Sequence, residues 1–331
     1  MISMGSKQEN TAENVLTALA SRSQKGLRLA RRTMLAEEIK GKSILEALEM
    51  YFLNWANFIH PGLFSLACEA SGGDPDHALE SQAAMSMLAA AFDLHDDVID
   101  RSKTKQGKPT VLEKFGRETA ILLGDAFLVR GFTLFSESIE NRSKKERRKI
   151  MCILRESLFE LGNAHSLELG LRGRMDITPE EYEPILSMKA ASLEADARIG
   201  GIIGGGRDDE VESLAKYGKI VGILATLREE FVDILDFKEL RQRMKREYLP
   251  IPIQYAFRNK TERESILDVL TSQPARKKDL DGIILQSDGV LQLREKMEML
   301  ATEADHQLDR LRESEAKHLL KRLLFAVMEK I

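Results

Sequence analysis

Three carboxylates stand close together at the end of a long apolar segment, in the stretch from Leu94 to Asp100. On a helix, Asp96 and Asp100 lie at i and i+4 on one face, where like charges repel by roughly a few tenths of a kcal/mol. A cation would relieve this repulsion. Magnesium typically takes one or two protein carboxylates and completes its octahedron with water and phosphate oxygens. The stretch therefore predicts a magnesium site, and a solvated helix end is the alternative that the residues leave open.

A second acidic face lies later in the chain, where Glu229, Asp233 and Asp236 have the spacing i, i+4 and i+7. On a helix these side chains also point the same way. Two such faces opposed across an apolar bundle could grip a diphosphate through bridging magnesium ions. Three lysines are candidates for balancing the charge of the leaving group: Lys105, Lys189 and Lys245. The combined pattern favours metal-dependent diphosphate chemistry.

The elements that must position these groups are helices. The 331 residues include only eight prolines, are rich in helix-forming types and show few alternating β-branched runs. We expect almost no strand, and helices at 10–40, 43–57, 61–71, 77–101, 108–114, 117–137, 144–171, 179–204, 208–236, 249–257, 260–272, 277–285 and 288–331. Nothing reads as a linker, so we expect one large all-helical domain over residues 1–331, with residues 1–40 as an N-terminal helical extension within it.

Composition narrows the classes of function. A formal charge of -4 does not indicate a nucleic-acid-binding protein. The basic run at 144–149 is interpreted as solvated surface. Two cysteines inside apolar helical stretches do not indicate a disulfide framework. The N-terminal residues lack the apolar core of a signal peptide, and no window of 18 uncharged apolar residues follows. We therefore expect a cytoplasmic protein without a transmembrane segment. His95, beside the first acidic motif, is interpreted as a structural hydrogen-bonding residue rather than a base.

The motifs in this order and spacing resemble the trans-isoprenyl diphosphate synthases, or polyprenyl synthetases. The resemblance covers roughly residues 40–260 and rests on six segments: His95–Asp100, Gly107–Thr110, Leu123–Ala126, Lys189–Ala191, Val232–Asp236 and Tyr248–Pro250. It implies the isoprenoid synthase fold, which is a bundle of antiparallel helices around a deep apolar pocket, usually in a homodimer. It also implies that magnesium withdraws the diphosphate from an allylic prenyl diphosphate, leaving a carbocation for isopentenyl diphosphate to attack.

The resemblance assigns roles to individual residues. Asp96 and Asp100 would be direct magnesium ligands, and Asp97 would orient bound water. Lys105 and Lys189 would neutralise the allylic diphosphate as it leaves. Charge that is positioned in advance in this way is a major source of catalysis.

The second motif departs from the family pattern at a metal ligand. Its first acid is replaced by Val232, which cannot bind metal, whereas Asp233 is kept. Glu229 lies three residues earlier, nearly one helical turn, and is our candidate for a substitute ligand. At the first motif, Ala91 and Phe92 stand where the family sets the floor of its pocket, although simple core packing also explains them.

The contacts expected for isopentenyl diphosphate are missing. The family's Gly-Gly-Lys-X-X-Arg-Pro aligns with residues 55–61, so that Asn57 and His60 replace its two cations. Gln106 replaces an arginine after the first motif, and Ala89 replaces a histidine or glutamine before it. A charge-assisted hydrogen bond contributes about 1.5–3 kcal/mol, so these losses predict poor recognition of a second diphosphate.

Two classes of function follow from this pattern. In the first, the protein is a prenyltransferase-type enzyme that ionises an allylic prenyl diphosphate; its acceptor is other than free isopentenyl diphosphate, or the cation is quenched by water or by cyclisation, as in a terpene cyclase. In the second, it is a catalytically poor subunit that pairs with an active synthase. Ordinary chain elongation through substitute contacts also remains open.

Overall fold

The computed structural model describes residues 5–55, 57–105, 107–235, 240–241, 243–244, 247–271 and 282–328, and it is helical along almost all of that length. The all-α fold class is therefore confirmed. The chain divides into two compact units, each described below by itself. The first comprises Met1–Met151, Asp196–Val211 and Arg312–Leu319, and the second comprises Cys152–Ala195, Glu212–Leu311 and Leu320–Ile331. A single domain over residues 1–331 stays a prediction.

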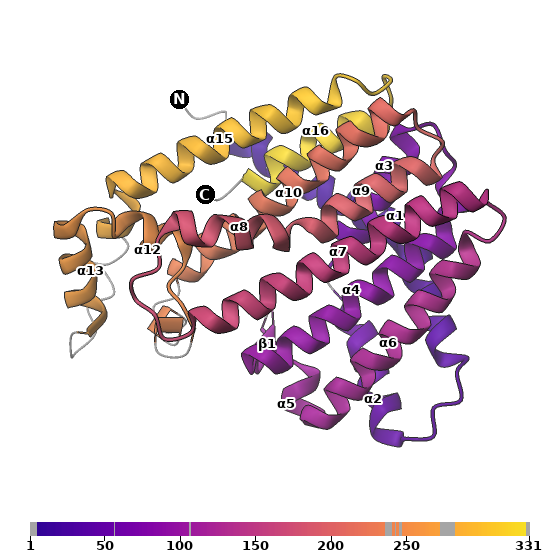
Figure 1. Cartoon of the computed structure of the whole chain (residues 1–331), viewed down its shortest axis with the longest axis horizontal. Coiled ribbons are helices and arrows are strands. Elements are labelled where there is room, and N and C mark those ends of the chain that lie inside the picture. The colour runs from indigo at the N-terminus through magenta and orange to yellow at the C-terminus, as the bar shows by residue number, and fades with distance from the viewer. Residues whose placement is uncertain are drawn as a thin grey trace. The chain divides into compact units, whose positions relative to one another are not determined.

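The first unit is built around the helix that ends in the first acidic motif. Its elements are α1 (Gly5–Leu35), α2 (Lys42–Leu53), α3 (Ile59–Ala70), the 3-10 turn η1 (Pro75–Ala78), α4 (Leu79–Asp100), the hairpin of β1 (Thr104–Lys105) and β2 (Lys108–Pro109), α5 (Val111–Phe115) and α6 (Arg117–Ser138). Within this unit α4 packs mainly against α6, and also against α1 and α3 (Figure 1). The acidic end of α4 is thus carried by the central helix of its unit.

Glycines allow α4 and α6 to approach closely. A Cβ built on Gly131 of α6 would lie 3.0 Å from a methyl group of Leu88, and one built on Gly124 would lie 2.5 Å from Nε2 of His95. Both neighbours belong to α4. Backbones can come this near only where the side chain is absent. Gly124 and Gly131 therefore allow tight packing of this pair of helices.

The later helices contribute to both units. They are α7 (Lys144–Leu171), α8 (Pro179–Lys189), α9 (Ala191–Ile203), α10 (Asp208–Leu235), α12 (Ile251–Ala256), α13 (Lys260–Thr271), α15 (Asp288–Leu308) and α16 (Glu315–Met328). The unit boundary falls inside α7, α9, α10 and α16. Within the second unit, α12 packs against α8 and α15 (Figure 1).

Several expected boundaries were wrong. The helix expected at 179–204 is interrupted after Lys189, and the helix expected at 288–331 stops at Leu308. A new helix starts after Ser314, whose Oγ accepts a hydrogen bond from the backbone N of Lys317 at 3.1 Å, as an N-cap does. Residues 108–109 form a short hairpin strand, because Gly107 adopts a positive φ of 75° that glycine tolerates best.

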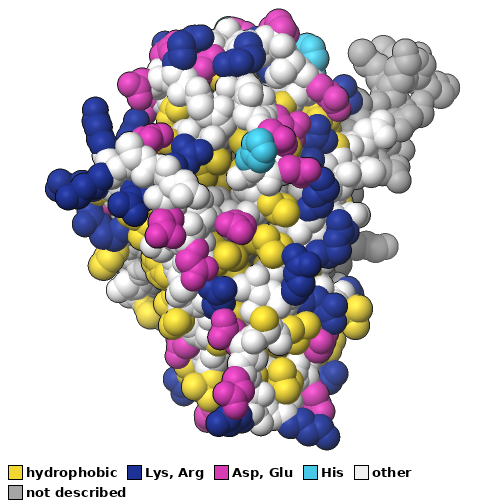
Figure 2. All heavy atoms as spheres, turned by 90° about the vertical axis from the view of Figure 1, so that its right-hand side faces the viewer, with side chains coloured by type: hydrophobic (Ala, Val, Ile, Leu, Met, Phe, Trp, Pro, Cys, Tyr) yellow, Lys and Arg dark blue, Asp and Glu magenta, His cyan; other side chains and the backbone are white. Residues whose placement is uncertain are grey.

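Helix α6 is long and apolar enough to cross a membrane by length and composition alone. Only 39% of its most apolar window is buried, and Leu122 and Val129 remain 54% and 68% exposed. Its other face packs on α4, as a core helix of a globular protein does. The expectation of no transmembrane segment stays a prediction. Figure 2 shows one face of the molecule, on which basic and acidic side chains are interspersed with apolar ones.

Candidate active site

The first acidic motif occupies the last two turns of α4. Asp97 is only 5% exposed, Asp96 is half-buried, and Asp100 is exposed at the final residue of the helix. The C-terminal end of a helix carries partial negative charge, and no basic residue lies in the last turn of α4. The carboxylates therefore repel both one another and the helix end. A cation bound at this end would relieve both repulsions.

The hairpin after α4 brings Lys105 back to the motif. Its Nζ forms an ion pair with Asp93 and lies 3.5 Å from Oδ1 of Asp97. Partial burial lowers the pKa of Lys105, but the neighbouring carboxylates outweigh this effect and raise it above the usual value. Lys105 is therefore a permanent cation at the motif, held by carboxylates from the previous turns of α4.

The carboxyl of Asp97 is strongly perturbed. Burial raises its pKa to about 7, and the charges of Asp93 and Asp96 act in the same direction, while Lys105 opposes them. At neutral pH this carboxyl is poised between its two protonation states, which makes it sensitive to any added positive charge. Its role in orienting metal-bound water stays a prediction.

Asp93 is a site residue that sequence reasoning missed. Besides the ion pair with Lys105, it accepts a hydrogen bond of 2.9 Å from the hydroxyl of Tyr51. Tyr51 lies on α2, and its ring packs against Trp55 and Phe127. The sequence contained the evidence for this role, because an aspartate on an apolar helix, one turn before Asp96 and Asp97, is expected to need a hydrogen-bonding or charged partner.

The structure also explains the motif Leu123–Ala126. Asp125 of α6 lies 3.2 Å from Nε2 of His95, and Gly124 leaves room for the imidazole ring. His95 thus joins α4 to α6, in line with the interpretation as a structural residue. The two residues expected at the pocket floor lie on α4, where Ala91 is fully buried and Phe92 half-buried. Their role in setting the length of the product stays a prediction.

The segment that lacks the isopentenyl diphosphate cations contacts a buried carboxylate through His60. Nδ1 of His60 lies 2.5 Å from Oδ2 of Asp196, which is carried by α9 within the first unit. Asp196 is 1% exposed, and burial raises the pKa of its carboxyl against the opposing effect of His60. His60 therefore contacts a buried carboxylate of the protein itself, at the position where the resemblance implies a diphosphate-binding arginine. Gln106 and Ala56 lie outside the described residues.

In the second unit, Lys189 ends α8 and is held by a half-buried carboxylate. Its Nζ lies 2.8 Å from Oε1 of Glu168, which also accepts hydrogen bonds from the hydroxyls of Tyr248 at 2.6 Å and Tyr182 at 2.8 Å. Burial alone would raise the pKa of Glu168, but Lys189 and the two hydroxyls outweigh it and lower the pKa. Lys189 keeps 25% of its side chain exposed, so its ammonium is positioned and still accessible.

The second acidic motif lies on the last turns of α10. Glu229 is exposed, Asp233 is half-buried, and Val232 is 49% exposed beside them. These three residues share a face, as their spacing predicts. Asp236 and Lys245, expected as members of the same site, lie outside the described residues.

A buried arginine shapes this second motif and was also missed. The guanidinium of Arg243 donates to Oδ2 of Asp233 at 2.6 Å and to Oε1 of Glu230 at 2.9 Å. Glu230 is buried, and its other oxygen accepts from the backbone N of Ile251 at 3.0 Å. Asp233, an expected metal ligand, is therefore already engaged by a cation of the protein itself.

The carboxylates of the two acidic motifs are ligands of the type that magnesium prefers. Each motif offers two carboxylates at i and i+4: Asp96 with Asp100, and Glu229 with Asp233. Among the described residues, no group of three His, Cys, Asp or Glu side chains converges to form a metal centre. Paired carboxylates suit a cation that takes few protein ligands and completes its shell with water and phosphate oxygens.

Known proteins share both the sequence pattern and the fold. Residues 38–285 match the Polyprenyl synthetase family. The chain is 29% identical over 203 residues to a short chain isoprenyl diphosphate synthase of Methanothermobacter thermautotrophicus, which covers 61% of this chain and 62% of that protein. The chain therefore spans less than two thirds of this relative.

Solved structures agree with this match at the level of the fold. The geranylgeranyl pyrophosphate synthetase of Pyrococcus horikoshii superposes with a TM-score of 0.84 at 21% identity, covering 96% of this chain and 99% of that one. A polyprenyl synthase of Caulobacter crescentus, in complex with calcium and isoprenyl diphosphate, gives 0.79 at 21% identity, covering 96% and 98%. The family match spans well over half of the chain and confirms the resemblance found in the sequence: the protein belongs to the polyprenyl synthetase family.

Proposed function

We propose that the protein is a prenyltransferase-type enzyme of isoprenoid biosynthesis that binds an allylic prenyl diphosphate with Mg²⁺ and ionises it. The observation that carries this proposal is the end of α4, which carries Asp96, Asp97 and Asp100 and where Lys105 lies 3.5 Å from Asp97. The family match supports the substrate class, and the Caulobacter relative with calcium and isoprenyl diphosphate supports a divalent cation as its partner.

The residues of the chain have distinct tasks in this proposal. Asp96 and Asp100 would hold Mg²⁺, which supplies positive charge to the departing diphosphate. Lys105 would exchange its ion pair with Asp93 for a diphosphate oxygen, because a dianionic phosphate attracts an ammonium more strongly than a carboxylate does. Lys189, held by Glu168, is proposed as a further cation that binds a diphosphate. The C–O bond to the prenyl chain then breaks, and the diphosphate leaves with both electrons.

The second carboxylate pair, Glu229 and Asp233, would contribute less to metal binding than the first. Val232 cannot bind metal, and Asp233 is engaged by Arg243, so Glu229 is proposed as the substitute ligand. The acceptor is proposed to differ from free isopentenyl diphosphate, since His60 is engaged by Asp196 where a diphosphate-binding arginine is expected. Transfer to another acceptor, or quenching by water or cyclisation, completes the reaction.

A second candidate is a catalytically poor subunit that pairs with an active synthase. It is favoured by Val232 at the place of a metal ligand and by the lost cations at Asn57 and His60.

A subunit interface could form on α6, which has an exposed apolar face with Leu122 and Val129. We propose a homodimer through this face, in the cytoplasm. Val129→Glu should shift the mass measured by light scattering toward the monomer, whereas Thr302→Glu, at an exposed position of α15, serves as the control for added charge.

The proposal is tested by turnover. Purified protein is supplied with magnesium and C10, C15 or C20 allylic diphosphates, with and without isopentenyl diphosphate, while pyrophosphate release is measured and organic products are identified by mass spectrometry. Release without isopentenyl diphosphate supports the proposal. An elongated product formed only with isopentenyl diphosphate would overturn our reading of the acceptor. Binding without turnover would favour the subunit that pairs with an active synthase.

A further inference from the structure

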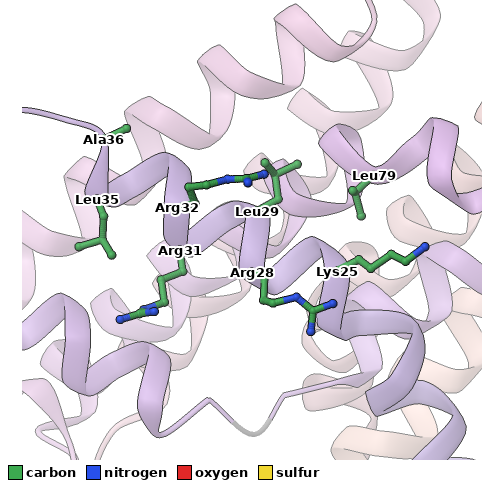
Figure 3. A pocket seen from close by; sticks show the side chains of 8 residues that line it. All are labelled: Lys25, Arg28, Leu29, Arg31, Arg32, Leu35, Ala36 and Leu79. Atoms are coloured by element: carbon green, nitrogen blue, oxygen red, sulfur yellow. The ribbon is translucent and has the colours of Figure 1, made fainter.

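A separate cavity lies on the N-terminal helix of the first unit. Its volume is about 730 Å³, within the range of small-molecule sites. Eight residues line it, seven from the α1 segment and one from the start of α4 (Figure 3): Lys25, Arg28, Leu29, Arg31, Arg32, Leu35, Ala36 and Leu79. The lining thus combines four cations with leucine side chains.

Two of the four cations have no carboxylate partner in the part of the chain that the structure describes. Lys25 pairs with Asp76 at 2.6 Å, and Arg31 pairs with Glu49 at 2.5 Å. By contrast, Arg28 reaches only the side-chain oxygen of Gln24 at 3.5 Å, and within the described ranges Arg32 has no ion pair. Arg28 and Arg32 are four residues apart on one helix, where like charges repel. An anion between them would relieve this repulsion.

The apolar part of the lining adjoins these arginines. Figure 3 shows the guanidinium of Arg32 beside Leu29, with Arg28 extending in another direction from the same helix. Leu35 stays 37% exposed at one end of the cavity, and Leu79 is half-buried. A ligand with a charged head at the arginines would therefore have a leucine-lined surface for an apolar tail.

We propose that this cavity binds an amphiphile with a phosphate or diphosphate head and an apolar tail. Arginine suits phosphate because its planar fork donates two parallel hydrogen bonds. The head is held by Arg28 and Arg32, whose flexible side chains leave the helix one turn apart and turn toward the bound anion, and the tail lies on Leu29, Leu35 and Leu79. A soluble prenyl diphosphate and an acidic membrane lipid share this chemistry.

The cavity is distinct from the acidic motif. Leu79 begins α4, and Asp96 lies 17 residues further, which is roughly 25 Å along a helix that rises 1.5 Å per residue. No carboxylate belongs to the lining, so binding here needs no metal. The site goes beyond the proposed function and does not depend on it.

The test measures binding to the full chain in EDTA, so that any magnesium-dependent site is silent. Farnesyl diphosphate and inorganic pyrophosphate are titrated by calorimetry against wild type and the Arg28→Ala/Arg32→Ala variant. We expect the double variant to bind farnesyl diphosphate at least tenfold more weakly, since each charge-assisted hydrogen bond lost costs about tenfold or more. Leu35→Ser should weaken farnesyl diphosphate and leave pyrophosphate unchanged.

A matched control uses the basic run at the start of α7. Arg147→Ala/Arg148→Ala removes the same charge from exposed positions that line no part of this cavity, so it should bind as wild type does. Thermal unfolding of every variant checks that the fold is intact.

Sedimentation with vesicles distinguishes the two ligand sources. Binding to phosphatidylglycerol but not phosphatidylcholine vesicles, lost in the Arg28/Arg32 variant, would assign the site to a membrane lipid, whereas binding of monomeric farnesyl diphosphate alone would assign it to a soluble one. Either result supports the site. Equal binding by the double variant and wild type would overturn it, as would pyrophosphate binding as tightly as farnesyl diphosphate.

Discussion

The first unit carries an acidic face on α4 and the second carries one on α10, and the two faces differ in the protein cations that pair with their carboxylates. On α4, Asp97 is buried with a raised pKa, and the cation next to it, Lys105, is shared with Asp93. On α10, the buried Glu230 and its neighbour Asp233 are both taken by Arg243. The acids of the α4 face are therefore proposed to bind a metal, whereas two acids of α10 are engaged by a buried arginine that stabilises the fold.

Removing the arginine of the α10 face should have the largest effect. Arg243→Met leaves Glu230 buried without its cation, and breaking a buried pair in this way typically costs about 3–5 kcal/mol. Urea denaturation at pH 7 measures the loss. Arg174→Met is the control, because its pairs with Asp176 and Glu181 lie at the surface, and it should change stability little. Similar losses from both variants would contradict a structural role specific to Arg243.

Neutralising the α4 face should remove activity rather than stability. The side chain of Asp100 is exposed, so the fold should tolerate Asp100→Asn. Loss of a charge that stabilises the leaving group should slow pyrophosphate release about 10²–10³-fold. Asp208→Asn, at a side chain that is 96% exposed, is the control. Unchanged pyrophosphate release by the Asp100 variant would contradict a catalytic role for the acidic face of α4.

The carboxylate that holds Lys189 should matter for stability in a pH-dependent way. Glu168→Gln removes charge-assisted hydrogen bonds and should cost about 1.5–3 kcal/mol at pH 7. Because the folded pKa of Glu168 is lowered from 4.5, wild type binds fewer protons at this site when folded than when unfolded. The advantage of wild type is therefore fully present above pH 4.5 and shrinks as the pH falls through the folded pKa. A difference between the two proteins that is constant from pH 3 to 7 would contradict this assignment.

The smallest effects should come from the exposed acids of α10. Glu229→Gln should reduce magnesium-dependent pyrophosphate release by about tenfold, the effect of roughly 1.4 kcal/mol. Val232→Asp, at a position that is 49% exposed, should raise it by a similar factor by restoring an acid beside Asp233. Intact release in the Glu229 variant would show that Glu229 is no substitute ligand.

The sequence was sufficient for whatever depends on local spacing. Helical content, the shared face of Asp96 and Asp100, and the acidic face of α10 all follow from helical periodicity. The partners of these groups did not follow, because they come from distant segments: Tyr51 reaches Asp93 from α2, and His60 meets Asp196 across 136 positions of the chain. Such pairs are set by the packing of helices, which periodicity does not specify.

The helix breaks show the same limit. The interruption after Lys189 carries neither glycine nor proline, so no local signal marked it. By contrast, the turn at Gly107 lies in the gap between the helices expected at 77–101 and 108–114, although its short hairpin was not expected. Local chemistry thus located most breaks, and tertiary packing decided the rest.

The most direct test of the central claim compares the two substrates in binding. Calorimetry with magnesium would measure Kd for an unreactive thiolodiphosphate analogue of farnesyl diphosphate and, separately, for isopentenyl diphosphate. We predict metal-dependent binding of the allylic analogue, lost in Asp96→Asn, and binding of isopentenyl diphosphate at least a hundredfold weaker, as expected from roughly two lost charge-assisted contacts. Comparable affinities for both ligands would contradict the claim that the allylic half of the site is kept while the isopentenyl half is lost.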